Sequence, residues 1–249
     1  MKLYENERCD EVNDSLSLIQ KTDGLTFGTD ALLLAGYIGG KYKKGMELGG
    51  GSGIISMLLL TRGKIDFADC VEVQNEYALL IERNAELNSL SERMKAIHAD
   101  VRNLKKTEEY DILFTNPPYM KNDSGKNNQN DKKAIARHEI FGDISDFCDA
   151  ARGLLKYGGA FFAVYRPDRL SDIVCAMRNS GIEPKRMTFV HADINSESSM
   201  VLIEGKRGAK SGMQLTNPLI IYRDKEHRQY TEDMDYIMEN GSFPDRYKR

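Results

Sequence analysis

From about Lys44 onward, short apolar runs typical of β-strands alternate with longer segments whose apolar residues have helical spacing. The strand-like runs cover 46–48, 65–73, 94–99, 110–115, 159–165, 185–191 and 198–204, and the helical segments cover 54–61, 76–87, 143–155 and 170–179. This alternation is typical of a parallel sheet wrapped by helices. Only the polar stretch ADINSES separates the last two runs, which favours a hairpin-like, antiparallel last strand. We therefore expect an α/β fold with a seven-stranded, mostly parallel sheet and helices on both faces.

The segment before this series, residues 15–38, predicts a short strand pair and then a helix that starts near Thr29. A chain of 249 residues suits one large α/β domain or two small ones. We expect a single domain, 1–249, made of an N-terminal cover (1–42), a core (43–205) and a C-terminal extension (206–249).

The charge balance is mildly acidic, with 35 Lys and Arg against 38 Asp and Glu and a net charge of −3. This counts against a protein that coats nucleic acid without specificity. Charge is distributed unevenly along the chain. Acidic side chains outnumber basic ones in residues 1–30, whereas residues 200–230 carry six basic residues: Lys206, Arg207, Lys210, Arg223, Lys225 and Arg228. That basic segment is a candidate contact for a polyanion, and a solvated face is an equally good interpretation.

Composition also indicates the cellular compartment and the kinds of site that the chain can form. The longest apolar runs are far too short to cross a bilayer, and the acidic, polar N-terminus is unlike a signal peptide, so we expect a cytoplasmic protein. The four cysteines, at 9, 70, 148 and 175, include no CxxC pair, and the histidines are scattered. Neither a metal site nor a disulfide framework is predicted.

The most informative segment for binding is the glycine-rich turn from Glu47 to Ile55. Its glycines at 49, 51 and 53 form GxGxG, whereas a dinucleotide fingerprint would need glycine at position 54 and a P-loop would need a following Lys-Ser/Thr pair. Glu72 ends the next strand, where carboxylates bind ribose hydroxyls. The acid before the loop, the glycines and Glu72 together resemble S-adenosylmethionine-dependent methyltransferases with a Rossmann-like class I fold.

This resemblance implies a set of cofactor-binding residues. Asp100 would accept a hydrogen bond from the exocyclic amine of the adenine and Val101 would lie against its ring, although a strand-end Asp is also a common turn cap. The full set of implied cofactor contacts is Asp30, Glu47, Gly49, Gly51, Gly53, Glu72, Val73, Asp100, Val101 and Asn116.

The run Asn116-Pro117-Pro118-Tyr119, at the end of the fourth strand, is more specific than the glycines. Two prolines stop the strand and fix a turn that presents carbonyl groups. The Asn oxygen and the Pro117 carbonyl can both accept from one planar NH2 group, while Tyr119 can stack on a planar base or amide. These four residues are the candidate catalytic residues, and NPPY resembles amino-methyltransferases acting on adenine N6, cytosine N4 or glutamine N5.

Three further stretches narrow the resemblance: Phe27–Ala35 (FGTDALLLA), Ala136–Glu139 (ARHE), and the segment from Val201–Gly205 (VLIEG) to Asn217–Tyr222 (NPLIIY). Together they resemble the bacterial tRNA(Val) adenine-N6 methyltransferase family, which modifies the adenine at position 37. The resemblance implies a tRNA partner and places Asp30 near the methionine end of the cofactor or at the mouth of the site, where it could equally cap a helix. The candidate RNA contacts are Arg137, His138, Lys206, Arg207 and Lys210.

Alternatives with the same chemistry are methylation of a glutamine N5 in a protein or of an adenine in DNA or rRNA. A glutamine methyltransferase would usually need an additional substrate domain, and a DNA methyltransferase would need a target-recognition domain. Little chain is left for either domain. A non-catalytic RNA-binding module is a third alternative, which the intact NPPY run and Glu72 disfavour. No obligate protein partner and no membrane contact are expected, and the polar stretch 121–134 predicts a loop.

Overall fold

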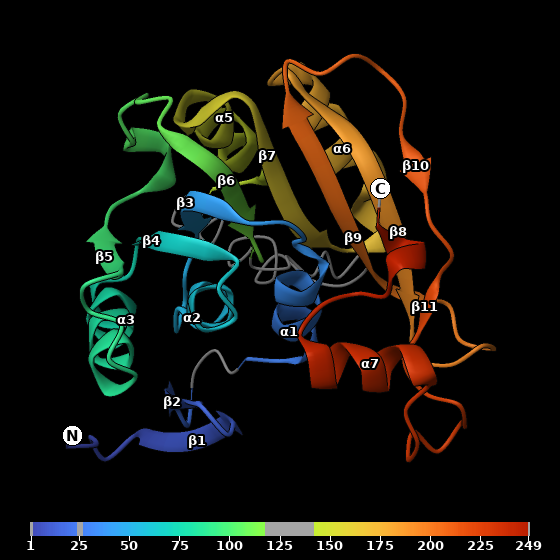
Figure 1. Cartoon of the computed structure of the whole chain (residues 1–249). Coiled ribbons are helices and arrows are strands. Elements are labelled where there is room, and N and C mark those ends of the chain that lie inside the picture. The colour runs from blue at the N-terminus through green and yellow to red at the C-terminus, as the bar shows by residue number, and fades with distance from the viewer. Residues whose placement is uncertain (1, 24–26, 118–141, 249) are drawn as a thin grey trace, which may run out of the picture.

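The computed structural model describes residues 2–23, 27–117 and 142–248, and a twisted sheet runs through it (Figure 1). Its strands lie in the order β8-β9-β7-β6-β3-β4-β5, and all are parallel except β9, which pairs antiparallel with β7 and β8. Their bounds are β3 (Tyr42–Leu48), β4 (Ile65–Glu72), β5 (Met94–His98), β6 (Tyr110–Thr115), β7 (Leu155–Tyr165), β8 (Ile182–His191) and β9 (Ser198–Arg207). All seven predicted strands are present and the last of them is antiparallel, as expected, but the predicted number of strands in the sheet is too low.

Two short strands extend this sheet at its β8 side. β10 (Gln214–Leu215) and β11 (Leu219–Ile220) both pair parallel with β8. They bring this sheet to nine strands within the described residues. Two-residue strands are too short to produce an alternating pattern, so the sequence does not reveal them. β11 pairs with Val190 and His191 and therefore lies at the end of β8.

Helices cover both faces of the sheet, as expected. On one face lie α1 (Thr29–Tyr37), α2 (Ile54–Thr61) and α3 (Asn75–Leu87), and on the other lie α5 (Ile144–Leu154) and α6 (Leu170–Asn179) (Figure 1). In α5, the buried residues Ile144, Phe147, Cys148 and Ala151 have the i, i+3, i+4, i+7 spacing that gives a helix one apolar side. The short helices η1 (Val101–Asn103) and η2 (Pro167–Arg169) follow β5 and β7.

The N-terminal segment is a hairpin of β1 (Glu7–Asn13) and β2 (Leu16–Lys21). It packs on α2 and α3, and the buried amide of Asn84 on α3 binds both backbone groups of Ile19: Ile19 N donates to Oδ1 at 2.7 Å and Nδ2 donates to the Ile19 carbonyl at 3.0 Å. The expected position of the strand pair, between Ser15 and the helix at Thr29, is therefore wrong for one strand. β1 precedes Ser15, and the sequence does not reveal it because it is mostly polar and exposed and carries little hydrophobic signal.

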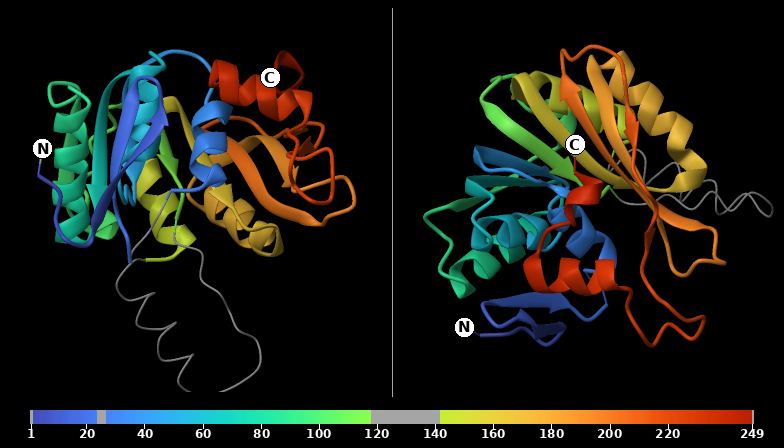
Figure 2. Two further views of the ribbon diagram at one scale, coloured as in Figure 1. Left: turned by 90° about the horizontal axis from the view of Figure 1, so that it is seen from below. Right: turned by 45° about the vertical axis from the view of Figure 1, so that its right-hand side comes forward.

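The C-terminal segment forms α7 (Glu232–Asn240) and η3 (Asp245–Tyr247), which lie beside α1 in both views of Figure 2. Phe243 contacts Tyr37 of α1 edge to face, with ring centroids 5.4 Å apart. None of the helices in the described ranges is long and apolar enough to traverse a lipid bilayer.

The parallel strands end together at one edge of the sheet, the carboxyl edge, marked by Leu48, Glu72, His98 and Thr115. In open α/β sheets, ligands bind at this edge, where the strand order reverses. Here β3 is the first strand of the series, and β4 and β6 lie on its two sides. The turns that follow β3, β4 and β6 therefore meet, and they contain the glycines, Glu72 and Asn116.

Candidate functional site

The glycine turn leaves β3 at Leu48 and enters α2 at Ile54. Gly49, Gly51 and Gly53 have φ angles of +73°, +55° and +80°, the left-handed region in which side chains with a Cβ are strained. A Cβ at Gly53 would lie 2.6 Å from the Met94 side chain, whereas a Cβ at Gly51 would meet no atom of the described residues within 4 Å. Gly53 thus serves the packing of the turn, and Gly51 borders open space at the carboxyl edge.

Glu72 is attached to this turn through its carboxylate. The backbone N–H of Gly51 donates to Oε2 at 3.0 Å, and the N–H of Gln74 donates to Oε1 at 2.9 Å. An ionised carboxylate has about four lone-pair sites, so two backbone bonds fix its orientation and leave sites for further donors. The vicinal hydroxyls of a ribose are donors of this kind.

Glu47 has a different place from Glu72. It is buried, and its Oε2 accepts hydrogen bonds from the backbone N–H of Ser56 at 3.0 Å and the Ser56 hydroxyl at 2.6 Å. Burial raises the pKa of Glu47 to about 7. The described contacts of this carboxylate are all inside the protein, so it fixes the start of α2 beneath the turn, and its expected contact with a cofactor remains a prediction.

Asp100 caps η1 and binds Arg102. The Arg102 backbone N–H donates to Oδ1 at 2.9 Å, and the guanidinium binds both carboxylate oxygens. These hydrogen bonds with Arg102 lower the pKa of Asp100. Val101 beside it is 7% exposed, and the Val73 carbonyl lies 3.0 Å from His98 Nε2. The cap alternative for Asp100 thus describes its contacts in this structure, and its role toward an adenine amine remains a prediction.

Asn116 directly follows β6. A hydrogen bond from the Thr115 hydroxyl holds that strand end against the glycine turn. Thr115 Oγ1 donates to the Leu48 carbonyl at 2.7 Å, inside the protein. Asn116 Nδ2 donates to Asp30 Oδ2 at 2.8 Å, while Asn116 Oδ1 is buried and has no hydrogen-bond partner in the described part of the chain. A buried oxygen without a donor costs free energy, so this acceptor is available to a donor that lies outside the described residues.

These residues together offer acceptor groups and open space of the kind that a nucleoside would need. Glu72 offers acceptor sites for hydroxyls, and the space beside Gly51 would be filled by any larger side chain at that position. Asn116 Oδ1 adds a further acceptor at the neighbouring strand end. Pro118 and Tyr119 of the predicted catalytic run, the candidate contacts Arg137 and His138, and the loop at 121–134 lie outside the described residues.

The remaining candidate RNA contacts lie at the amino ends of the parallel strands, opposite the carboxyl edge. They are Lys206, Arg207 and Lys210. Arg207 ends β9 opposite Ile182, where β8 begins. Its side chain is buried, and it donates to the Glu108 carboxylate and to the Leu155 carbonyl. A guanidinium occupied in this way is not free to meet a phosphate, so the structure does not support an RNA contact through Arg207.

The second half of the basic segment lies at the carboxyl edge. Tyr222 N donates to the Ala192 carbonyl at 2.8 Å, directly beyond the end of β8. The Tyr222 ring stacks on His227 and on Tyr230, with centroid distances of 4.6 and 5.2 Å, and the intervening turn exposes Lys225 and Arg228. The segment YRDKEHRQY has a tyrosine at each end of a stretch with three basic residues, and this is the signal that would have favoured this half of the segment over residues 206–210.

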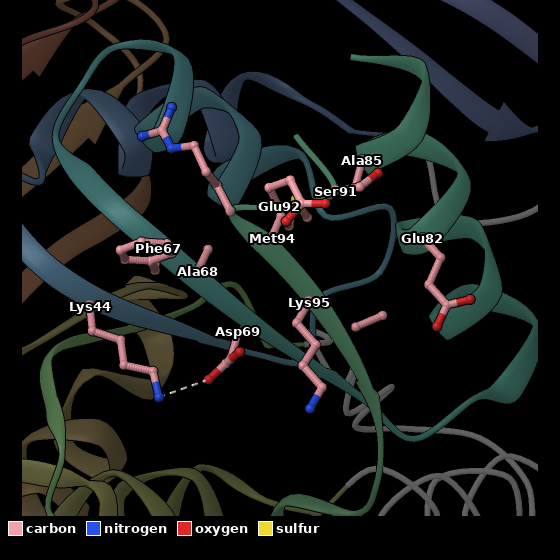
Figure 3. A pocket seen from close by; sticks show the side chains of 12 residues that line it. Lys44, Phe67, Ala68, Asp69, Glu82, Ala85, Ser91, Glu92, Met94 and Lys95 are labelled. Atoms are coloured by element: carbon pink, nitrogen blue, oxygen red, sulfur yellow. Dashed lines mark ion pairs between the residues drawn. The ribbon is translucent and has the colours of Figure 1, made fainter. Parts of the chain in front are cut away.

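A separate hollow lies between the first halves of β3, β4 and β5 and the side of α3 (Figure 3). Its lining mixes charges of both signs, and Lys44 and Asp69 form an ion pair there at 3.3 Å. These residues lie toward the opposite ends of the strands from Leu48 and Glu72, so the hollow is not part of the candidate site. In the ranges that the structure describes, no group of three or more His, Cys, Asp or Glu side chains is arranged to hold a metal ion.

Comparisons with known proteins give the relatives of this chain. The family model described as "Methyltransferase small domain" matches residues 22–169. Two curated proteins named tRNA1(Val) (adenine(37)-N6)-methyltransferase are each 27% identical: that of Pedobacter heparinus over 173 residues (69% of this chain and 73% of that protein) and that of Aeromonas hydrophila over 183 residues (73% and 76%).

Solved structures show the same fold. A predicted O-methyltransferase from Agrobacterium tumefaciens superposes with a TM-score of 0.70 at 21% identity, covering 86% of this chain and 98% of that one. M. jannaschii TYW2 in complex with AdoMet gives a TM-score of 0.56 at 13% identity, covering 83% and 88%. The expected class I methyltransferase fold is confirmed.

Proposed function

The chain belongs to the methyltransferase small domain family, and from this membership we propose that it transfers a methyl group from S-adenosylmethionine to N6 of an adenine in tRNA, at position 37 of tRNA(Val). The observation that carries this proposal is the buried Asn116 Oδ1, an acceptor without a donor in the described part of the chain, at the strand end beside the glycine turn. The relatives from Pedobacter heparinus and Aeromonas hydrophila, which bear the name of that activity, support the choice of substrate.

The residues of the carboxyl edge fit the proposed cofactor. Glu72 would accept hydrogen bonds from the ribose hydroxyls, with its carboxylate oriented by Gly51 and Gln74. The glycine turn lets a ligand come close to the backbone, since Gly51 has no Cβ and its neighbourhood is open. Asp100 would accept from the adenine amine in exchange for part of its bonding to Arg102, because the Arg102 bonds already engage both carboxylate oxygens.

The chemical problem for the protein is the weak nucleophilicity of N6, whose lone pair is delocalised into the adenine ring. S-adenosylmethionine, when bound, supplies a methyl group on a positively charged sulfur that is a good leaving group. Asn116 Oδ1 and the Pro117 carbonyl would accept the two N6–H hydrogen bonds and thereby hold the nitrogen in the direction of attack. No strong base is needed before attack, because orientation supplies much of the rate.

A tRNA substrate has to present its adenine outside the base stack. Tyr119 would stack on the flipped base, an expectation from the NPPY run. Lys225 and Arg228 are exposed at the carboxyl edge and are suited to meet phosphates of the same RNA loop. A chain with a net charge of −3 can bind RNA if its basic residues are gathered beside the site in this way. Action on tRNA places the protein in the cytoplasm.

The experiment is methyl transfer with labelled S-adenosylmethionine to separate pools of unmodified tRNA, rRNA, DNA and protein, followed by nucleoside or amino-acid analysis. The expected product is N6-methyladenosine in tRNA, which maps to position 37 of tRNA(Val). Label in glutamine or in DNA, with none in RNA, would contradict the proposed substrate. A second unmodified tRNA that lacks adenine at position 37 is the matched control and should remain unlabelled.

A further inference from the structure

The direction of the Asn116 amide is fixed by a residue far away in the sequence. Asp30, in the first turn of α1, accepts a hydrogen bond from Asn116 Nδ2 at 2.8 Å. A carboxylate accepts and does not donate, so only the nitrogen end of the amide can face Asp30. Asn116 Oδ1 must then point the other way, and in the described part of the chain this oxygen is buried without a donor.

Asp30 is itself held in place at the start of its helix. Its Oδ1 accepts from the backbone N–H of Ala31 at 2.9 Å, while Oδ2 receives Asn116. The N-terminal end of a helix carries partial positive charge, which favours a carboxylate at this point. The two oxygens of Asp30 therefore bind different elements: Oδ1 binds the backbone of α1, and Oδ2 binds the side chain at the end of β6.

The opposite end of α1 is anchored by two buried basic side chains. Lys64 Nζ donates to the carbonyls of Ala35, Gly36 and Ile38, and Arg186 donates to the carbonyl of Tyr37 at 2.9 Å. These are the last carbonyls of the helix, which have no partner inside it. With both ends fixed, α1 carries Asp30 to a defined distance from Asn116.

We propose that Asp30 is a positioning residue for methyl transfer, which holds the Asn116 amide with its oxygen toward the acceptor nitrogen of the substrate. This inference rests on the proposed function. With Nδ2 occupied by Asp30, the strand end offers Asn116 Oδ1 and the Pro117 carbonyl, both hydrogen-bond acceptors. The site then selects a substrate that presents an NH2 group, such as adenine, over one that presents a carbonyl oxygen at the same place, such as hypoxanthine.

The first test replaces Asp30 with asparagine, which keeps the shape but can either donate or accept. In Asp30→Asn the two amides can pair in either direction, so part of the Asn116 population turns its nitrogen toward the substrate. We expect kcat with tRNA to fall by about two- to tenfold, because the reversed pairing is unproductive and a neutral amide holds Asn116 more weakly than the carboxylate does. The dissociation constant of the cofactor, measured by calorimetry, should remain within about twofold, because both Asp30 oxygens are bound inside the protein, by Ala31 and Asn116, and Glu72 and the glycine turn are unchanged. A larger loss of affinity would instead support the cofactor contact that the sequence resemblance implies for Asp30.

A matched control separates this role from a role in helix stability. Asp172 is also an aspartate in the first turn of a helix, α6, and it is partly exposed and paired with Arg169. Asp172→Asn should leave kcat unchanged. The side-chain NH2 signals of Asn116 in a 15N NMR spectrum, assigned by their loss in Asn116→Ala, should move in Asp30→Asn and stay in place in Asp172→Asn. This readout requires neither cofactor nor turnover.

The second test exchanges the two side chains. Asn116→Asp alone sets two carboxylates against each other where a 2.8 Å hydrogen bond now exists, and should lose activity. Adding Asp30→Asn supplies a donor to the new carboxylate at position 116 and leaves its other oxygen toward the substrate. The double variant should be at least about tenfold more active than Asn116→Asp.

Each failure has its own signature. If the wild-type protein methylates tRNA but Asp30→Asn keeps full kcat and unmoved Asn116 signals, or if the exchange restores nothing, the role of Asp30 is refuted. If the wild-type protein transfers no methyl group to any RNA, the proposed function fails, whatever the NMR signals of Asn116 show.

Discussion

Glu72 and Gly51, 21 residues apart, are joined by a 3.0 Å hydrogen bond from the Gly51 N–H to Glu72 Oε2. The bond connects the strand end that carries the ribose-binding candidate to the glycine that borders open space. It means that the carboxylate and the turn are oriented together before a ligand arrives. Such preorganisation lowers the cost of binding.

Replacing Glu72 with glutamine therefore has a defined expected effect. An amide cannot accept from both Gly51 and Gln74 in the present geometry, and it loses the charge that strengthens bonds to hydroxyls. We expect the dissociation constant of S-adenosylmethionine to rise by about 10- to 100-fold in calorimetry. Glu76→Gln is the control, because Glu76 starts α3 nearby but pairs with Lys21. Equal affinities for the two variants would remove Glu72 from the cofactor site.

Two glycines with similar backbones test whether the cofactor lies beside Gly51. Gly51 and Gly63 have φ angles of +55° and +62°, and a Cβ at either would meet no atom within 4 Å in the part of the chain that the structure describes. Alanine at either position should cost about 1–2 kcal/mol of unfolding free energy, since only the backbone is strained. Gly51→Ala alone should also weaken cofactor binding, by at least about tenfold, because its methyl group takes the ligand's space. Similar cofactor affinity in both variants would place the ligand elsewhere.

The buried Glu47 makes stability depend on pH. Its pKa is raised from 4.5 to about 7 by burial, so between these values the unfolded chain loses its proton first. The free energy of unfolding then falls as the pH rises from 4.5 to 7, by up to about 3 kcal/mol. The measurement is the free energy of unfolding in urea at about pH 5 and at about pH 8, two values that span most of this window. Glu47→Gln should remove the decline between them. Glu82→Gln, at an exposed position, is the control and should keep it. A decline of unchanged size in Glu47→Gln would show that another group titrates.

The two halves of the basic segment can be tested against each other. Lys225 and Arg228 are exposed at the carboxyl edge, while Lys206 and Lys210 lie toward the opposite edge. Reversing the charges of Lys225 and Arg228 should raise the KM for tRNA and lower its dependence on salt by about one to two released ions. The matched pair Lys206→Glu with Lys210→Glu should leave both quantities near wild type. The reverse result would restore the strip at residues 206–210 as the RNA contact.

Short-range features of the chain were predictable, and long-range contacts were not. The helix bounds and the seven strands follow from apolar spacing within about a dozen residues, and the GxGxG turn is local by nature. The contact between Asp30 and Asn116 spans 86 residues and depends on how α1 is anchored, which no local pattern encodes. The burial of Arg207 likewise depends on Glu108, a partner 99 residues away, so a count of basic residues overestimates the surface charge at this position.

The most direct measurement compares the wild-type protein with Asn116→Ala for methyl transfer to unmodified tRNA(Val), with cofactor affinity measured in parallel. Removal of the acceptor oxygen should abolish N6-methyladenosine in the digested tRNA, while the dissociation constant of S-adenosylmethionine stays within about threefold, because the glycine turn and Glu72 are untouched. An Asn116→Ala protein that methylates tRNA at the wild-type rate would contradict the assignment of this strand end as the catalytic centre.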